Sequence, residues 1–107
     1  MENIETKTEK VSRLRVLSTV QNFIDCLGPE DSAEVRAQLE TLEKGSTEKL
    51  MIKTLRGKTK ELIIKQYRIV FFRRETMMYV VDAFKKQSKK TPLRIIERAE
   101  KIYKQIK

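Results

Sequence analysis

The sequence contains no histidine and no tryptophan, and its only cysteine is Cys26. Without histidine, an imidazole acid or base is excluded, and so are zinc sites. One cysteine cannot form an internal disulfide, and the first ten residues have no apolar leader segment, so we expect a reducing, cytoplasmic setting. No stretch long enough to span a bilayer is apolar throughout, which predicts no membrane span.

Acidic residues are scarce in the second half of the chain. Residues 1–50 carry seven Lys or Arg and ten Asp or Glu, a net charge of −3, whereas residues 51–107 carry seventeen and five, a net charge of +12. A domain with one strongly basic half attracts polyanions, of which nucleic acid is the commonest. The alternative is a lysine-rich surface that is simply solvated.

The first half shows helical periodicity. In residues 13–27 apolar side chains recur at steps of three and four, which predicts an amphipathic helix, although residues 11–16 could instead form a short edge strand. Gly28-Pro29 ends this helix, and residues 30–45 form a second. Because the link is short, we expect an antiparallel helical hairpin. Residues 1–10 are polar and expected to be frayed.

The second half is rich in strand-forming residues. Strands are expected at residues 50–55, 61–64, 67–72 and 77–84, the last two antiparallel. Lys65-Gln66 is either a tight turn or a bulge. A final amphipathic helix follows Thr91-Pro92.

These elements predict one α+β domain over residues 1–107. Its parts would be an N-terminal helical hairpin, a small antiparallel sheet of three to four strands with the helices on one side, and a C-terminal helix.

Two basic features stand out in this frame. Arg68 lies in an otherwise apolar strand, so it must reach a partner: either a phosphate, or Glu61 or Asp82 in a salt bridge at the edge of the sheet. Residues 85–90 contain four lysines and no acid. Such a loop, beside the start of a helix, suits phosphate binding, and Arg68 could add a fork of donors.

RNA cleavage is one chemistry that needs no histidine. Attack by the RNA's own 2′-hydroxyl builds negative charge on phosphorus, which arginine and lysine can stabilise without a metal or cofactor. A lysine crowded by other cations could move the proton; Glu61, Tyr67 and Tyr79 are the alternative carriers.

Four segments carry a family resemblance. They are residues 53–57 (KTLRG), 61–63 (ELI), 67–71 (YRIVF) and 84–92 (FKKQSKKTP). From Val16 onward the chain resembles the RelE/HigB family of toxins, in the branch often labelled phage-derived. Ile63 stands where that family usually has arginine, which removes one phosphate-binding group. The turn at Lys65-Gln66 is shorter than usual, and the strand that commonly opens the fold is poorly marked.

The resemblance implies a cytoplasmic toxin of a type II toxin–antitoxin system, an endoribonuclease that cleaves mRNA on the ribosome and so inhibits translation. Its partners would be ribosome-bound mRNA and a small antitoxin, of helix-turn-helix type; weak self-association is compatible with this interpretation. By position, the expected catalytic residues are Arg68, Lys85, Lys86 and Glu61. The expected RNA-binding residues are Arg56, Lys58, Lys60, Arg73, Lys89 and Lys90.

Two other function classes compete with the enzyme. A non-catalytic RNA- or ribosome-binding module, a toxin relic, is favoured by Ile63. A DNA-binding regulator is a weaker hypothesis, because the first two predicted helices lie in the acidic half and offer no basic recognition helix.

Overall fold

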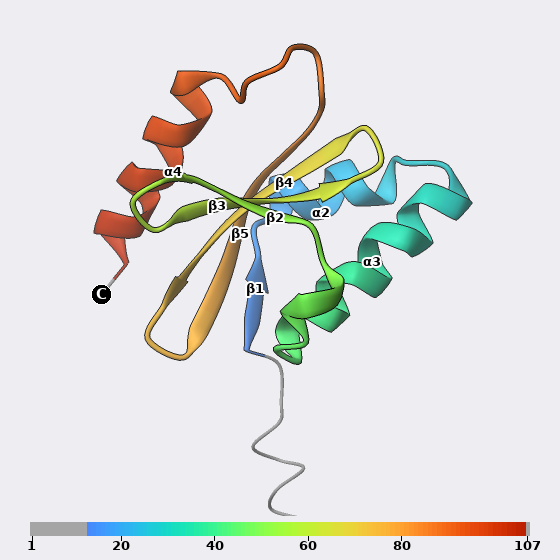
Figure 1. Cartoon of the computed structure of the whole chain (residues 1–107), viewed down its shortest axis with the longest axis horizontal. Helices are drawn as coiled ribbons and strands as arrows, with labels where there is room; N and C mark the ends of the chain where they lie inside the picture. The colour runs from blue at the N-terminus through green and yellow to red at the C-terminus, as the bar shows by residue number, and fades with distance from the viewer. Residues whose placement is uncertain (1–12, 107) are drawn as a thin grey trace, which may run out of the picture.

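The structure, a computed structural model, describes residues 13–106, so the fraying expected for residues 1–10 falls outside it. Figure 1 shows a twisted sheet with helices on both sides. In chain order the elements are β1 (Leu14–Val16), α2 (Ser18–Asp25), α3 (Pro29–Glu43), the 3-10 turn η1 (Thr47–Lys49), β2 (Ile52–Arg56), β3 (Thr59–Ile64), β4 (Tyr67–Arg74), β5 (Met77–Lys85) and α4 (Leu93–Gln105).

The sheet differs from the prediction. Its five strands run in the order β1-β5-β4-β3-β2, and β1 pairs with β5 in parallel, so the sheet is mixed rather than antiparallel. The predicted antiparallel pairing of the last two strands is correct, with Arg68 opposite Phe84. Lys65-Gln66 forms a tight turn rather than a bulge, and Lys65 adopts a φ of 53° there.

The predicted N-terminal helical hairpin followed by a small sheet is wrong. Residues 14–16 form edge strand β1, so α2 begins only at Ser18. The sequence offered an edge strand at residues 11–16 only as an alternative to helix, because β1 is three residues long and its apolar residues continue the spacing of the helix behind it. Parallel pairing with β5, the last strand in sequence, needs long-range contacts that local periodicity does not reveal.

Each face of the sheet has its own core, so the helices do not share one side as predicted. Buried Val20 of α2 and Val35 of α3 pack with Ile69 on one face, which we call the α2–α3 face. Buried Ile95 and Ala99 of α4 pack on the other, the α4 face, with three sheet residues. These are Val70, Phe72 and Val81. Charged side chains can therefore be assigned to one face or the other by strand alternation.

The helices themselves show no membrane character. Within residues 13–106, none is long and apolar enough to cross a bilayer. The longest, α3, has 15 residues and begins with Pro29, followed by Glu30 and Asp31, whose charges suit the positive end of a helix.

Candidate functional site

Arg68 and Glu61 lie together on the α4 face. Glu61 is buried, and the Arg68 side chain is only 12% exposed. Arg68 Nε lies 3.9 Å from Glu61 Oε2, and Arg68 Nη1 donates to the carbonyls of Lys65 at 3.1 Å and Tyr67 at 2.9 Å. Arg68 Nη2 has no protein partner among residues 13–106. The guanidinium is thus held on one side, and Nη2 is left for a ligand.

The lysine-rich loop is attached to the same pair. The Thr91 hydroxyl donates to Glu61 Oε1 at 2.5 Å, so the carboxylate that faces Arg68 also holds the end of the loop. Lys85, Lys86, Lys89 and Lys90 are all exposed, and none forms an ion pair within the described part of the chain. Figure 1 shows this loop arching between β5 and α4. The pairing of Arg68 with Glu61, one of the alternatives left open by the sequence, is therefore present, and it positions the loop as well.

The β3–β4 turn joins the two parts of the site. The Lys65 carbonyl accepts from Arg68, and the next carbonyl, that of Gln66, accepts from the backbone N–H of Lys86 at 2.7 Å. One two-residue turn therefore fixes both the guanidinium and the start of the lysine-rich loop.

Asp31 of α3 secures this turn from the α2–α3 face. Its carboxylate accepts from Lys65 Nζ at 2.8 Å and from the Tyr67 hydroxyl at 2.6 Å. These bonds, the one from Lys65 first, lower the pKa of Asp31 below its usual value. The same carboxylate raises the pKa of Tyr67. The Tyr67 hydroxyl lies on the α2–α3 face, on the opposite side of the strand from Arg68, and its raised pKa favours the protonated form. Tyr67 is therefore poorly placed as the proton carrier considered from the sequence.

Four other predicted RNA-binding residues lie elsewhere. Lys58, Lys60 and Arg73 line a hollow of about 730 Å³ on the α2–α3 face. Arg56 lies at the far end of the α4 face from Arg68, where Glu100 accepts from its Nε at 2.9 Å and its Nη2 at 2.6 Å. The structure therefore divides the predicted set into Arg68, Glu61 and the loop lysines on one side, and these four residues away from them.

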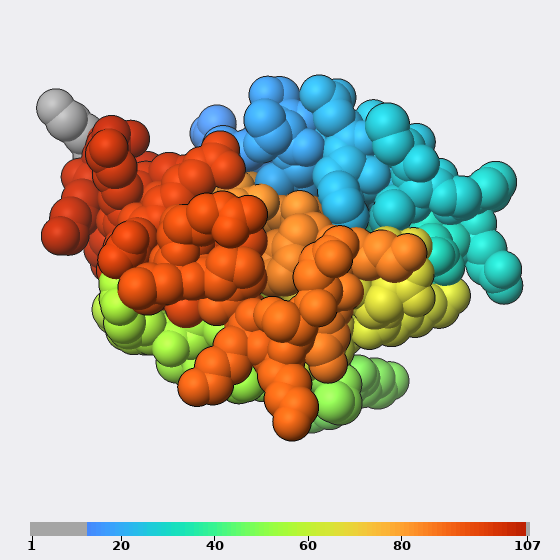
Figure 2. Space-filling model, turned by 90° about the horizontal axis from the view of Figure 1, so that it is seen from above, coloured from blue at the N-terminus to red at the C-terminus, as the bar shows by residue number. Residues whose placement is uncertain are grey.

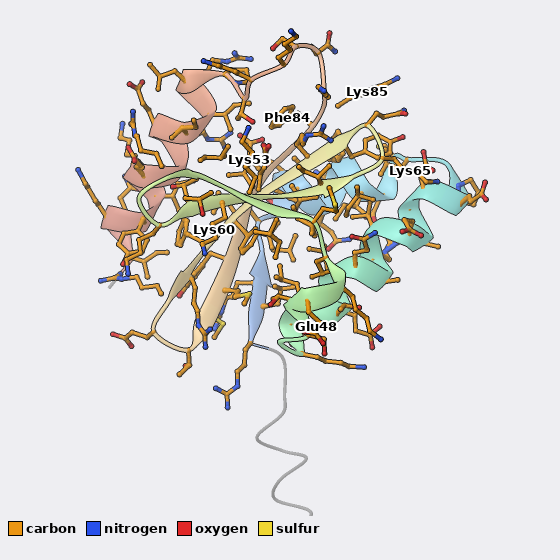
Figure 3. All side chains as sticks on the ribbon, in the orientation of Figure 1. Glu48, Lys53, Lys60, Lys65, Phe84 and Lys85 are labelled. Atoms are coloured by element: carbon orange, nitrogen blue, oxygen red, sulfur yellow. The ribbon has the colours of Figure 1, made fainter. Side chains whose placement is uncertain are left out.

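Two residues that the sequence reasoning did not select also belong near Arg68. Lys53 is exposed and sits directly opposite Glu61, so both project to the α4 face. Phe84, half-buried, sits directly opposite Arg68. In Figure 3 both lie in the region bounded by α4 and the loop, whereas Lys85 points outward. Strand register was the missing signal: period-2 alternation places Lys53 on the face of Glu61 only once the pairing is known.

The charged groups that surround Arg68 are mostly cationic side chains, which do not bind metal ions. Within residues 13–106, no group of three or more Cys, Asp or Glu side chains is arranged to hold an ion. Tyr79, the second tyrosine considered as a proton carrier, stacks on buried Phe72 with ring centroids 5.5 Å apart, away from Arg68. Ile63 lies opposite Arg68 on the side away from Phe84, so the residue that departs from the RelE/HigB pattern lines the site itself.

Comparison with models of known protein families assigns the chain to one of them. Residues 22–104, most of the sequence, match the family model described as phage-derived protein Gp49-like. A search among curated proteins finds no match. The matched segment includes Arg68, Glu61 and the whole lysine-rich loop, together with all but the last residue of α4. The chain belongs to the Gp49-like family of phage-derived proteins, which is associated with toxin–antitoxin systems.

Proposed function

We propose that this chain is the toxin of a type II toxin–antitoxin pair and that it inhibits translation by cleaving mRNA on the ribosome. The observation that supports this most is the arrangement on the α4 face. There Arg68 is oriented by Glu61 and two carbonyls, beneath a loop of four exposed lysines. The site can therefore hold one phosphate rigidly while the loop binds its neighbours.

In the proposed reaction the RNA supplies its own nucleophile. The 2′-oxygen bonds to the adjacent phosphorus as the bond to the 5′-oxygen breaks, leaving a 2′,3′-cyclic phosphate and a 5′-hydroxyl. Arg68 would donate through Nη2 to the phosphate as charge accumulates there. The ammonium of Lys85 or Lys86 would give a proton to the leaving oxygen, and the 2′-hydroxyl proton would be released to solvent water.

Glu61 takes a different role from the one expected from the sequence. It is 4% exposed and already accepts from Thr91, and it lies beside the Arg68 guanidinium. A carboxylate in these surroundings orients its partners, so we assign Glu61 to positioning rather than to proton transfer.

Inducible expression in a bacterium tests the proposal. The parent should arrest growth, and mapping of mRNA 5′ ends should reveal cuts within codons. Arg68→Ala, and Lys85→Ala combined with Lys86→Ala, should relieve the arrest at equal protein levels. Lys44→Ala with Lys49→Ala, two exposed lysines in the acidic half, should leave the arrest intact. Arrest that is unchanged by the Arg68 and loop variants would contradict the site assignment.

A second function, non-catalytic binding to RNA or the ribosome, is favoured by Ile63. It stands opposite Arg68, where a second arginine would otherwise reach the phosphate. Translation arrest without any cut in the mRNA would support this alternative. Ile63→Arg would then be expected to introduce cleavage, whereas in an active enzyme it should change the rate only modestly.

The antitoxin remains part of the proposal. A small helix-turn-helix protein encoded beside this chain would be expected to suppress the arrest and to form a complex with the purified protein. Co-purification of the two, and loss of toxicity on co-expression, would test this partner.

A further inference from the structure

A hollow of about 400 Å³ opens beside the lysine-rich loop, along the edge of β5. Two phenyl rings line it, Phe84 of β5 and Phe23 of α2, and three cationic side chains contribute to its wall. These cations are Lys85, Lys90 and Arg94. Figure 2 shows β5 recessed between α4 and α2 at this place. Its volume is within the range of small-ligand sites, roughly 300–1,000 Å³.

The hollow exists because β1 stops short. The parallel pairing of β1 with β5 ends where Val16 lies opposite Val80, so within residues 13–106 no strand pairs with the outer edge of residues 83–85. A neighbouring cavity shares Phe84, Arg94 and Ile95 with this hollow, so Phe84 lines both. Phe84 is half-buried, unlike the core aromatic Phe72, which is fully buried.

The edge of β5 also presents backbone groups to this hollow. The bond from Lys86 N–H to Gln66 marks a hydrogen-bonded pair of the β4–β5 ladder, so Phe84, two residues earlier, also bonds toward β4. Ala83 and Lys85 therefore turn their backbone groups outward. The Ala83 N–H is already taken by Asp82 Oδ1 at 2.8 Å. The Ala83 carbonyl and the Lys85 amide remain as an acceptor and a donor at the edge of an aromatic pocket.

We propose that this pocket binds one unstacked nucleobase of the RNA, with the ring of Phe84 against its face and the cations on the phosphates that flank it. The inference deepens the proposed function and rests on it for the identity of the polymer. Phenyl rings, a free strand edge and surrounding cations match the three parts of a single-stranded nucleotide: base face, base edge and phosphate. An acidic peptide would use the cations but would leave the two phenyl rings without a planar partner.

The pocket also gives a geometry for the cleavage site. Because Phe84 lies directly opposite Arg68 in the β4–β5 ladder, a base held on Phe84 places its own backbone within a nucleotide of the guanidinium. Base binding would thus determine which phosphate reaches Arg68. The pocket becomes a specificity determinant, distinct from the loop lysines that bind any phosphate.

Nuclear magnetic resonance of the isotope-labelled full chain tests the pocket without requiring cleavage. The probes are the four nucleoside 5′-monophosphates, and the matched control is ribose 5-phosphate, which has the sugar and phosphate but no base. At least one nucleotide should shift the amide signals of Ala83, Phe84 and Lys85. Ribose 5-phosphate should shift only signals of the lysine-rich loop, Lys85 included, and should leave those of Ala83 and Phe84 unchanged. Identical footprints for both kinds of ligand, or no footprint at residues 83–85, would overturn the proposal.

Two substitutions sharpen the test. Phe84→Leu keeps an apolar side chain but removes the ring, and should weaken nucleotide binding by about fivefold or more while leaving ribose 5-phosphate unaffected. Phe84→Tyr keeps the ring and should retain the affinity. Equal nucleotide affinity in Phe84→Leu and the parent would contradict the proposal that the Phe84 ring binds a base.

The outcomes separate the pocket from the enzyme. Nucleotide binding at residues 83–85 by a protein that never cuts mRNA would uphold the pocket and refute the endoribonuclease. Cleavage of mRNA by a protein whose signals at residues 83–85 shift with no nucleotide would uphold the endoribonuclease and refute the pocket.

Discussion

The two faces of the sheet use charge in different ways. On the α4 face the pair of Glu61 and Arg68 is largely buried and holds the end of the lysine-rich loop. On the α2–α3 face Asp31 lies near the surface and holds the β3–β4 turn through Lys65 and Tyr67. In this small protein, therefore, a largely buried ion pair orients the site, and a carboxylate near the surface supports the turn beside it. The turn at residues 65–66 is the point where the two sets meet.

The largest effect should come from removing the buried carboxylate. Glu61→Ala leaves Arg68 without its counter-ion and Thr91 without an acceptor, so we expect the free energy of unfolding to fall by about 2–3 kcal/mol. The value is set below that of a fully buried pair because Arg68 is 12% exposed and the atoms are 3.9 Å apart. Urea denaturation measures it.

The matched control is Glu100→Ala, which removes the partner of Arg56 in an exposed pair. Its denaturation midpoint should stay close to the parent's, since exposed pairs contribute little. If both variants lost the same stability, the contrast between buried and surface charge would be wrong.

Next in size is the effect of the loop on RNA binding. Lys85→Ala combined with Lys86→Ala removes two exposed cations and no packing, so the melting temperature should not change. Affinity for single-stranded RNA should fall, and the slope of log affinity against log salt should become shallower by about 1.4 if both lysines contact phosphates. Fluorescence anisotropy at several salt concentrations gives the slope.

The corresponding double variant on the α2–α3 face, Lys58→Ala with Lys60→Ala, shows whether the faces differ in RNA binding. Both lysines are exposed and line the 730 Å³ hollow on the α2–α3 face rather than the Arg68 site. If this variant flattened the slope of log affinity against log salt as much as the loop variant does, the RNA would contact both faces.

A smaller effect is expected from Asp31→Asn, which weakens the support of the β3–β4 turn without touching the α4 face. Because the Lys65 carbonyl holds Arg68 and the Gln66 carbonyl holds Lys86, a loosened turn should slow mRNA cleavage several-fold. A positioning role predicts a lower catalytic rate constant with little change in the RNA concentration for half-maximal rate. Asp31→Glu should restore part of the rate; an effect confined to thermal stability would contradict the role.

The smallest effect is a pH dependence of stability. The pKa of Asp31 is lowered in the folded protein by Lys65 and Tyr67, so the ionised form is favoured by folding. Its contribution is present above the ordinary value of 3.8 and is lost as the pH falls through the folded pKa below it. Denaturation midpoints measured from pH 6 down to about 2 should therefore fall less steeply for Asp31→Asn than for the parent.

Much of the second half of the fold could be predicted from local pattern. Alternating apolar residues located β4 and β5 and their antiparallel pairing, and the apolar stripe of α4 was visible from its spacing. The strand β1 could be offered only as an alternative to helix, because three residues carry too little periodicity and its partner is more than sixty positions away. The side on which each helix packs was also beyond the sequence, since either face of β4 is apolar.

The candidate site was predictable in composition but not in geometry. Arg68 stood out as a lone charge in an apolar strand, and its salt bridge with Glu61 was one of the two alternatives considered. That Lys60 and Arg73 project away from Arg68, and that Lys53 projects to its side, depends on strand register. The link from Asp31 to the turn joins residues more than thirty positions apart and has no local sequence signal.

Cleavage of mRNA on purified ribosomes tests the central claim most directly. The chain is added to ribosomes carrying a defined mRNA, and the 5′ ends of the fragments are mapped against time. The parent should cut within codons, and Arg68→Lys, which keeps the charge but not the fork of donors, should be slower by roughly 10²-fold. Lys44→Ala with Lys49→Ala should cut like the parent. No cutting by the parent, or equal rates for Arg68→Lys and the parent, would contradict the account.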